Sequence, residues 1–383
     1  MKEIKVGIIG TGFMGPIHIE ALRRLGFVKI EALAEVNKEL AKEKAAKFNI
    51  SKYYGDYREL LADKDIEVVH NCTPNFLHYQ INKEAIQAGK HIVSEKPLSM
   101  TTEESEELLK LARKNRIYHA VDFNYRQYPI VQEIRNRIKQ KDIGKDIYLI
   151  RGHYIQDWLL YDTDYNWRVE KKKGGSSRAV ADIGSHWCDL AQYLSGQKIV
   201  EVCAHLKTIL QVRKKPKGDI ETFKNKEEEN IDYKEIKVDT EDYATVLLKF
   251  TNGTVGSFTV SQVNAGHKND LFIEIDGTKK SYSWSQEEAN ELVIGYRDKP
   301  NEVLVKDPAL LCRDASDYAY YPGGHVEGWS EGVKNTFNSF YRCLLEKGDP
   351  KNYSFATFAD SYYENRLVEA ILKSAEKGRW IKV

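Results

Sequence analysis

The stretch Ile4-Lys5-Val6-Gly7-Ile8-Ile9-Gly10-Thr11-Gly12-Phe13-Met14-Gly15 decides the fold of this chain. Its first six residues are mostly apolar and predict a buried parallel strand, and the residues that follow, from Pro16 to Leu25, have the apolar spacing of a helix. Gly10 permits a tight bend, Gly12 lets the backbone approach a phosphate, and Gly15 lets the helix pack closely on the strand. Because amides at the start of a helix bind anions, the stretch predicts a dinucleotide site.

An ordinary glycine loop is the alternative, since such a triplet also occurs without a nucleotide. A second predicted strand, Val28 to Ala34, favours the dinucleotide interpretation. It is followed by Glu35, about 20 residues after the third glycine, where a carboxylate accepts hydrogen bonds from the adenosine ribose. The same carboxylate would repel a 2′-phosphate, so we expect NAD, with NADP less favoured.

Three further stretches, Ile66 to Cys72, His91 to Glu95 and Ile117 to Phe123, are predicted strands that alternate with helices. This alternation predicts a doubly wound parallel sheet, a Rossmann domain, over residues 1–123. Ligands bind at the carboxyl ends of such strands. The residues found there are Thr73-Pro74-Asn75, with His78 in the next helix, and Glu95-Lys96-Pro97.

The remaining residues, 124–383, predict an α+β domain. A helix near 127–140 and a strand near 147–155 precede a region rich in strands, residues 199–296, which we interpret as an antiparallel meander with a hairpin at Asn252-Gly253. A charged stretch, residues 213–237, predicts a solvated excursion. Two helices, near 329–346 and 355–377, end the chain.

Composition restricts the classes of function. The chain of 383 residues has 58 basic and 57 acidic residues, and this net charge of +1 gives no electrostatic reason to expect nucleic acid or an anionic membrane as partner. It has no apolar stretch long enough for a signal peptide or a membrane span, so we expect a cytoplasmic protein. Its five scattered cysteines indicate neither a disulfide framework nor a cysteine zinc site.

A second group of candidate residues is Asp182 to Asp189. Their four-residue spacing can place the side chains of Asp182 and His186 at the opening of the same site. Histidine is the side chain best suited to proton transfer near neutral pH. Asp189 could instead serve as a structural partner. We expect no metal, because no second histidine follows at ligand spacing. A run of aromatic and polar residues, 156–167, would suit a sugar ring, or it could be a packed edge of the domain.

Taken in order, five motifs resemble the glucose-fructose oxidoreductase and inositol dehydrogenase family. They are the glycine turn, Thr73-Pro74-Asn75 with His78, Glu95-Lys96-Pro97, Asn124-Tyr125-Arg126, and Asp182-Ile183-Gly184-Ser185-His186-Trp187-Cys188-Asp189. The resemblance spans nearly the whole chain. It implies an amino-terminal Rossmann domain and a carboxyl-terminal domain with a large open, mostly antiparallel sheet, often used for homodimer or homotetramer contacts.

The resemblance also implies roles for individual residues. Lys96 and His186 match the family's catalytic lysine and histidine, and Asp182 matches an acid that helps to hold the substrate; the bond from Lys96 to Pro97 is often cis. The implied cofactor-binding residues are Gly10, Gly12, Phe13, Met14, Gly15, Glu35, Thr73, Pro74, Asn75, His78, Glu95, Lys96, Asn124, Trp167 and Arg168, the last two by a looser match. The implied substrate-binding residues are Lys96, Tyr125, Arg126, Asp157, Trp158, Asp182 and His186.

The function that follows is an NAD-dependent dehydrogenase for a secondary hydroxyl of a sugar, glycoside or cyclitol. His186 would take the hydroxyl proton and Lys96 would stabilise the alkoxide. One alternative is a glycoside hydrolase in which NAD oxidises the substrate only transiently. The other is a cofactor-binding regulator without turnover, which would have little reason to keep these three side chains.

Overall fold

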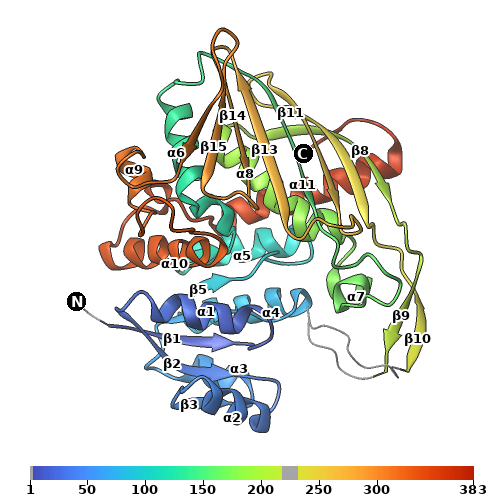
Figure 1. Ribbon diagram of the computed structural model, residues 1–383. Coiled ribbons are helices and arrows are strands. Elements are labelled where there is room, and N and C mark those ends of the chain that lie inside the picture. The colour runs from blue at the N-terminus through green and yellow to red at the C-terminus, as the bar shows by residue number, and fades with distance from the viewer. Residues whose placement is uncertain (1–2, 218–231) are drawn as a thin grey trace. The chain divides into compact units, whose positions relative to one another are not determined.

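The computed structural model describes residues 3–217 and 232–383 (Figure 1). The chain divides into two compact units. The amino-terminal unit contains the residues up to Asn124 together with Ser330–Asn365, and the carboxyl-terminal unit contains Tyr125–Trp329 together with Arg366–Val383. The last helix, α11 (Phe358–Lys377), therefore runs from one unit into the other.

The amino-terminal unit is built on a parallel sheet of six strands in the order β3-β2-β1-β4-β5-β6. This order is that of a doubly wound Rossmann fold, as predicted. It reverses between β1 and β4, so the carboxyl ends of these two strands mark the position where such sheets bind ligands. The strands are β1 (Ile4–Ile9), β2 (Val28–Ala34), β3 (Lys52–Tyr54), β4 (Val68–Asn71), β5 (His91–Ser94) and β6 (His119–Val121).

Five helices connect these strands, and polar side chains cap three of them. The side chains of Asn37, Asp56 and Thr101 each accept a backbone N–H from the first turn of the helix that follows. The cap from Thr101 begins the helix at the position that the capping pattern predicts. The helices are α1 (Met14–Arg23), α2 (Lys38–Lys47), α3 (Tyr57–Ala62), α4 (Asn75–Gln87) and α5 (Thr102–Lys114).

Helix α10 (Trp329–Glu346) packs with the amino-terminal unit although it is distant in sequence, as its orange-red ribbon in Figure 1 shows. Phe337 and Tyr341 on this helix are fully buried. The ring of Phe337 lies 4.6 Å from that of His18 on α1, and the Tyr341 hydroxyl lies 2.8 Å from His70 Nε2 on β4. These contacts explain why Ser330–Asn365 belongs with the Rossmann sheet.

The carboxyl-terminal unit is built on a nine-stranded sheet in the order β16-β15-β14-β13-β7-β12-β11-β8-β17. Its neighbouring strands are antiparallel with one exception, because β12 and β7 are parallel. The strands are β7 (Ile147–Ile155), β8 (Ile199–Lys207), β11 (Tyr243–Phe250), β12 (Val255–Ser261), β13 (Asp270–Gly277), β14 (Ser281–Ser285), β15 (Glu291–Gly295), β16 (Glu302–Val305) and β17 (Ile381–Lys382).

The simple meander expected for residues 199–296 is therefore wrong in one respect. The hairpin at Asn252-Gly253 is present, and Gly253 has the positive φ of +83° that its turn requires. However, β13 does not pair with β12, because β7 lies between them. Local turn signals predict which strands form a hairpin, but they do not reveal that an earlier strand is inserted between two later ones.

Helices cover one face of this sheet. The inward residues of its strands share a hydrophobic core with residues of α6 (Pro129–Lys139), α8 (Ser185–Ser195) and α11. The other face has exposed or half-buried residues in register across several strands, from Leu247 through Ser257, Arg151, Glu274, Ser283 and Val293 to Val303. The predicted open, mostly antiparallel sheet is thus confirmed.

The charged excursion contains a short antiparallel pair, β9 (Val212–Pro216) and β10 (Tyr233–Lys237), and residues 218–231 lie outside the described part of the chain. Short elements such as β3, β16, α7 (Lys171–Gly174) and α9 (Arg313–Ser316) have no clear sequence signal. None of the helices in the described residues is both long and apolar enough to cross a membrane.

Candidate nucleotide-binding and active site

The glycine turn after β1 has the geometry of a dinucleotide-binding loop. Gly10 has a φ of +85°, and a Cβ atom at Gly15 would lie 2.3 Å from the Gly10 carbonyl oxygen, so both positions need glycine for the fold itself. A Cβ atom at Gly12 would meet no heavy atom of the described residues within 4 Å. Gly12 therefore leaves room for a ligand, which fits the approach of a pyrophosphate to the start of α1. The adjoining Phe13 is 46% exposed and Met14 begins the helix.

Glu35, at the end of β2, lies beside this turn. Its Oε1 accepts hydrogen bonds from the Thr11 backbone N and from Thr11 Oγ1, each at 2.6 Å, and its Oε2 accepts one from Val36 N at 3.2 Å. A carboxylate has about four acceptor positions, so Glu35 can also accept from a ribose hydroxyl. The residues of the turn and Glu35 together fit NAD.

The next two strand ends are tied together by His78. Its Nδ1 lies 2.6 Å from the Pro97 carbonyl and its Nε2 lies 2.7 Å from the Thr73 carbonyl, and the side chain is buried. The bond between Lys96 and Pro97 is cis, as the resemblance implied. Asn75 and Asn124 are buried, whereas Thr73 is half-buried, with its hydroxyl donating to Asn71 Oδ1 at 2.6 Å. His78 thus fixes the segments that carry Thr73 and Lys96.

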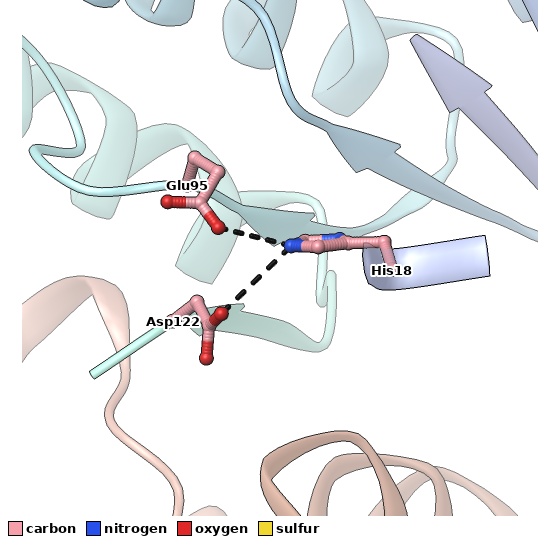
Figure 2. Close-up of side chains that lie close together, drawn as sticks. All are labelled: His18, Glu95 and Asp122. Carbon is pink, nitrogen blue, oxygen red and sulfur yellow. Dashed lines mark hydrogen bonds and ion pairs between the residues drawn. The ribbon is translucent and has the colours of Figure 1, made fainter. Parts of the chain in front are cut away.

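Glu95 was expected to contact the cofactor, but its side chain contacts protein groups. It is 5% exposed, and its Oε1 lies 2.9 Å from His18 Nε2. Figure 2 shows His18 facing both Glu95 and Asp122. His18 is not among the predicted site residues, although its position three residues after Gly15, on the inner side of α1, indicates burial.

In the carboxyl-terminal unit, Asp182 belongs to a π-helical segment, Val180–Gly184, directly before α8. Such segments are frequent at functional sites. Gln262 Nε2 donates to Asp182 Oδ2 at 2.9 Å, and Arg168 Nε lies 3.5 Å from Asp182 Oδ1. The structure therefore brings together two predicted residues, Asp182 and Arg168, and adds Gln262, which follows β12.

His186 lies in the first turn of α8 and packs against two tyrosines. Its ring centroid is 5.0 Å from that of Tyr125 and 6.4 Å from that of Tyr154. The two tyrosine hydroxyls are 2.6 Å apart, and both contact the side chain of Asn269, at 3.0 Å and 2.6 Å respectively. Burial raises the pKa of Tyr154 well above its usual value, so its hydroxyl stays protonated and can donate a hydrogen bond. Tyr154 and Asn269 were not predicted as site residues.

Other side chains expected to contact the substrate form hydrogen bonds or ion pairs with side chains of the carboxyl-terminal unit. Trp158 Nε1 donates to Gln156 Oε1 at 2.9 Å, and Asp157 Oδ2 accepts from Lys268 Nζ at 2.5 Å. Arg126 is 7% exposed and forms a two-point ion pair with Asp189, with Nε to Oδ2 at 2.8 Å. Trp167 stacks under the Arg168 guanidinium, 4.5 Å from its ring centroid. Asp189 thus serves as a structural partner of Arg126, one of the roles considered for it above.

One residue of the expected catalytic set, Lys96, belongs to the amino-terminal unit, and Asp182 and His186 belong to the carboxyl-terminal unit. Only one group of histidine and acidic side chains in the described ranges, 3–217 and 232–383, could hold a metal: His18, Glu95 and Asp122. It does not include the expected substrate residues.

Comparisons with known proteins agree with the fold of both units. Residues 4–123 match the family model described as "Oxidoreductase family, NAD-binding Rossmann fold", and residues 131–283 match the "GFO/IDH/MocA C-terminal domain". Fold and glycine turn thus define an NAD-binding oxidoreductase. The chain belongs to the GFO/IDH/MocA family, which confirms the resemblance found in its motifs.

Individual relatives cover the whole chain. A levoglucosan dehydrogenase from Pseudarthrobacter phenanthrenivorans is 32% identical over 100% of this chain and 99% of its own length. A crystal structure of an oxidoreductase domain protein from Kribbella flavida superposes with a TM-score of 0.89 at 28% identity, over 100% of both chains. A levoglucosan dehydrogenase in complex with NADH and levoglucosan superposes with a TM-score of 0.88 at 31% identity, again over 100% of both chains.

Proposed function

We propose that this protein oxidises a secondary hydroxyl of a sugar, glycoside or cyclitol, with NAD as hydride acceptor. The observation that carries the proposal is the similarity, over the full length of both chains, to a dehydrogenase whose structure holds NADH and the anhydrosugar levoglucosan. Levoglucosan and related sugars are therefore the first substrates to test.

The proposed mechanism assigns one role to each of three side chains. His186 takes the proton of the reacting hydroxyl, and the ammonium of Lys96 stabilises the oxygen as it becomes an alkoxide. Bound NAD supplies the carbon that accepts the hydride. Asp182, held by Gln262 at 2.9 Å, accepts a hydrogen bond from a substrate hydroxyl and fixes the sugar ring.

Neighbouring groups support this assignment. The ring of His186 packs against Tyr125 in an edge-to-face arrangement, and Asn269 links Tyr125 to Tyr154, so the ring of His186 has a fixed place. The aromatic surface of Trp158, fixed by its hydrogen bond to Gln156, suits stacking on a sugar ring. The same groups would serve the reverse reduction, since a catalyst accelerates both directions.

The experiment that tests this function is a screen of the purified protein with NAD against sugars, anhydrosugars, glycosides and cyclitols, in which NADH and released aglycone are both measured. Net NADH with at least one compound is the expected result. Aglycone release without net NADH would instead support the redox-assisted hydrolase. If the protein binds NAD but forms neither NADH nor aglycone with any compound, and also catalyses no reduction with NADH, the result would favour the cofactor-binding regulator.

We also propose that the protein assembles as a homodimer or homotetramer through the open face of the nine-stranded sheet. On this face Leu247 is 51%, Val293 is 37% and Val303 is 54% exposed, while charged residues such as Arg151 and Glu274 lie in register between them. Exposed apolar side chains grouped on one sheet face support its use as an interface between copies of the chain.

A further inference from the structure

A line of buried polar side chains crosses the amino-terminal unit and ends at Glu95, the residue before Lys96. The Tyr341 hydroxyl on α10 lies 2.8 Å from His70 Nε2 on β4, and His70 Nδ1 lies 2.8 Å from His18 Nδ1 on α1. His18 Nε2 then lies 2.9 Å from Glu95 Oε1. Tyr341, His70 and His18 are all fully buried, so their protons cannot be exchanged freely with solvent.

The proton positions in this line follow from its first member. Burial raises the pKa of Tyr341 well above its usual value, so Tyr341 keeps its proton. Among the residues that the structure describes, His70 is its one hydrogen-bond partner, so the hydroxyl donates to His70 Nε2. Burial lowers the pKa of His70 well below its usual value. His70 is therefore neutral, and its proton is on Nδ1.

The remaining steps carry this direction to Glu95. The Nδ1–H of His70 donates to His18 Nδ1, which must then accept, so the proton of His18 is on Nε2 and faces Glu95. A cationic His18 would require the opposite arrangement, in which His70 donates to the Tyr341 oxygen and the buried Tyr341 proton loses its acceptor. Leaving such a group without a partner is costly. In each of the three hydrogen bonds, the donor is thus the residue nearer to Tyr341 and the acceptor is the residue nearer to Glu95.

Asp122 completes the arrangement (Figure 2). Its Oδ2 lies 3.8 Å from His18 Nε2. Burial, and then the charge of Glu95, raise the pKa of Asp122 well above its usual value. Burial alone would also raise the pKa of Glu95, but the hydrogen bond that it accepts from His18 Nε2 lowers it below its usual value. The pair therefore has a single negative charge, on Glu95, and the proton is on Asp122.

The ionised carboxylate also touches the next residue, because Glu95 Oε2 accepts a hydrogen bond from the Lys96 backbone N at 3.3 Å. We propose that Tyr341, His70 and His18 are positioning residues that hold this carboxylate in place and thereby fix Lys96 for the reaction. The inference rests on the function proposed above for Lys96. It explains why α10, far away in sequence, packs its tyrosine against β4.

The direct test is nitrogen-15 NMR of the histidine side chains, which reports the protonated nitrogen of each ring, with signals assigned by His18→Asn and His70→Gln. In the parent protein we expect His70 to be protonated on Nδ1 and His18 on Nε2. Tyr341→Phe keeps the shape of the ring but removes the donor, so His70 should gain the Nε2-protonated form. Tyr282→Phe is the control, since this buried tyrosine of the other unit bonds Asp142; it should change neither ring.

Kinetics then test the consequence for Lys96. In Tyr341→Phe, kcat for the sugar should fall roughly threefold to tenfold, the effect of about one neutral hydrogen bond, while KM for NAD changes by less than about twofold. Tyr282→Phe should keep the parent kcat. Rescue in Tyr341→His, which restores a donor, would support the direction of the line.

Three results would overturn the inference: Nε2-protonated His70 in the parent, unchanged tautomers in Tyr341→Phe, or unchanged kcat in that variant. A fourth is a stoichiometric metal ion in the purified protein that is lost in His18→Asn, since His18, Glu95 and Asp122 would then be ligands. A parent protein that oxidises no sugar would overturn the proposed function and the role of Lys96, whereas the NMR result would still decide the proton positions.

Discussion

At the scale of single residues, Lys96 and His186 carry the proposed chemistry. His186→Asn removes the proton acceptor and Lys96→Met removes the positive charge at the alkoxide, so each variant should lower kcat by roughly two orders of magnitude or more. Their combination should cost less than the product of the single effects, since both act on one oxygen. Steady-state kinetics with the best sugar and fluorescence titration with NADH make the measurement.

The control for this pair is Lys110→Met, an exposed lysine on α5 paired with Glu106, which should keep the parent kcat. Asp182→Asn should mainly raise KM for the sugar. A Lys96→Met or His186→Asn protein that folds, binds NADH and turns over near the parent rate would refute these roles, and the chemistry would have to be sought at Tyr125, Asp157 or His325.

Glu35 determines the choice of cofactor in this account. Glu35→Gln removes the charge that repels a 2′-phosphate and weakens the bond to the ribose, so kcat/KM with NAD should fall about tenfold, and the ratio of NAD to NADP activity should decrease. The matched control is Glu39→Gln, an exposed glutamate in α2, which should leave both constants unchanged. A parent protein with higher kcat/KM for NADP than for NAD would show that Glu35 has another role.

The sequence identified candidate residues best where local spacing constrains them. The glycine turn and Glu35 are set by one strand, one turn and the next strand, and the structure places them together. His18, Gln262 and Asn269 escaped notice, because their partners are far away in sequence and no local pattern announces the contact. The ion pair between Arg126 and Asp189 also joins residues far apart in the sequence, and no local pattern predicts it. Contact of the substrate with Arg126 remains a prediction.

At the scale of elements, a buried ion cluster fixes the segment that carries Trp158 and Arg168. The Asp242 carboxylate, fully buried, accepts from Arg178 and from Arg213 Nη2, the latter at 2.8 Å. Arg213 Nη1 donates to the carbonyls of Tyr161 and Asp164, both at 3.0 Å. The cluster thus ties this segment to β9 and to the start of β11.

Replacing Asp242 should therefore destabilise the protein strongly. Asp242→Asn leaves two buried guanidinium groups without their shared counter-charge, which costs about 3–5 kcal/mol of unfolding free energy. The control is Asp162→Asn, which breaks the ion pair between Asp162 and Lys214, two side chains that are each about half exposed. This variant should lose only about 0–1 kcal/mol of unfolding free energy. Denaturant unfolding at pH 7 measures both. A loss below about 1 kcal/mol for Asp242→Asn would contradict this account.

The contribution of Asp242 should also depend on pH. Burial alone would raise its pKa, but Arg178, the Leu210 N–H and Arg213 lower it below the usual value. A carboxyl group whose pKa is lower in the folded state stabilises the fold above its unfolded pKa, and this stabilisation is lost as the pH falls through the folded pKa. The difference in melting temperature between parent and Asp242→Asn should narrow below about pH 4. A constant difference down to about pH 2 would show that the charge of Asp242 contributes nothing.

The elements themselves were largely predictable, for physical reasons. Strands rich in branched apolar residues, such as β1 and β4, and amphipathic helices, such as α10, have strong local patterns, and their positions agree with the sequence to within a few residues. Pairing was less predictable, because it depends on contacts distant in sequence. The insertion of β7 between β12 and β13, and the packing of α10 on the Rossmann sheet, are both of this kind.

At the scale of the whole molecule, we predict that copies of the chain assemble through the open face of the nine-stranded sheet. Size-exclusion chromatography coupled to light scattering should give the mass of a dimer or a tetramer of the 44.1 kDa chain. Leu247→Glu with Val293→Glu places two charges on this face and should shift the protein to a smaller species. The control, Leu310→Glu, charges an apolar residue, 61% exposed, outside the sheet. A monomeric parent, or a double variant with unchanged mass, would exclude this interface.

The central claim is that hydride passes directly from a secondary carbon of a sugar to NAD. Its most direct measurement uses the best substrate of the screen, carrying deuterium at each secondary carbon in turn, followed by mass spectrometry of the nicotinamide product. Deuterium from one position should appear in NADH, together with the ketone from the same carbon. NADH without deuterium from any position, or release of aglycone with the label retained in the sugar and no net NADH, would contradict the claim.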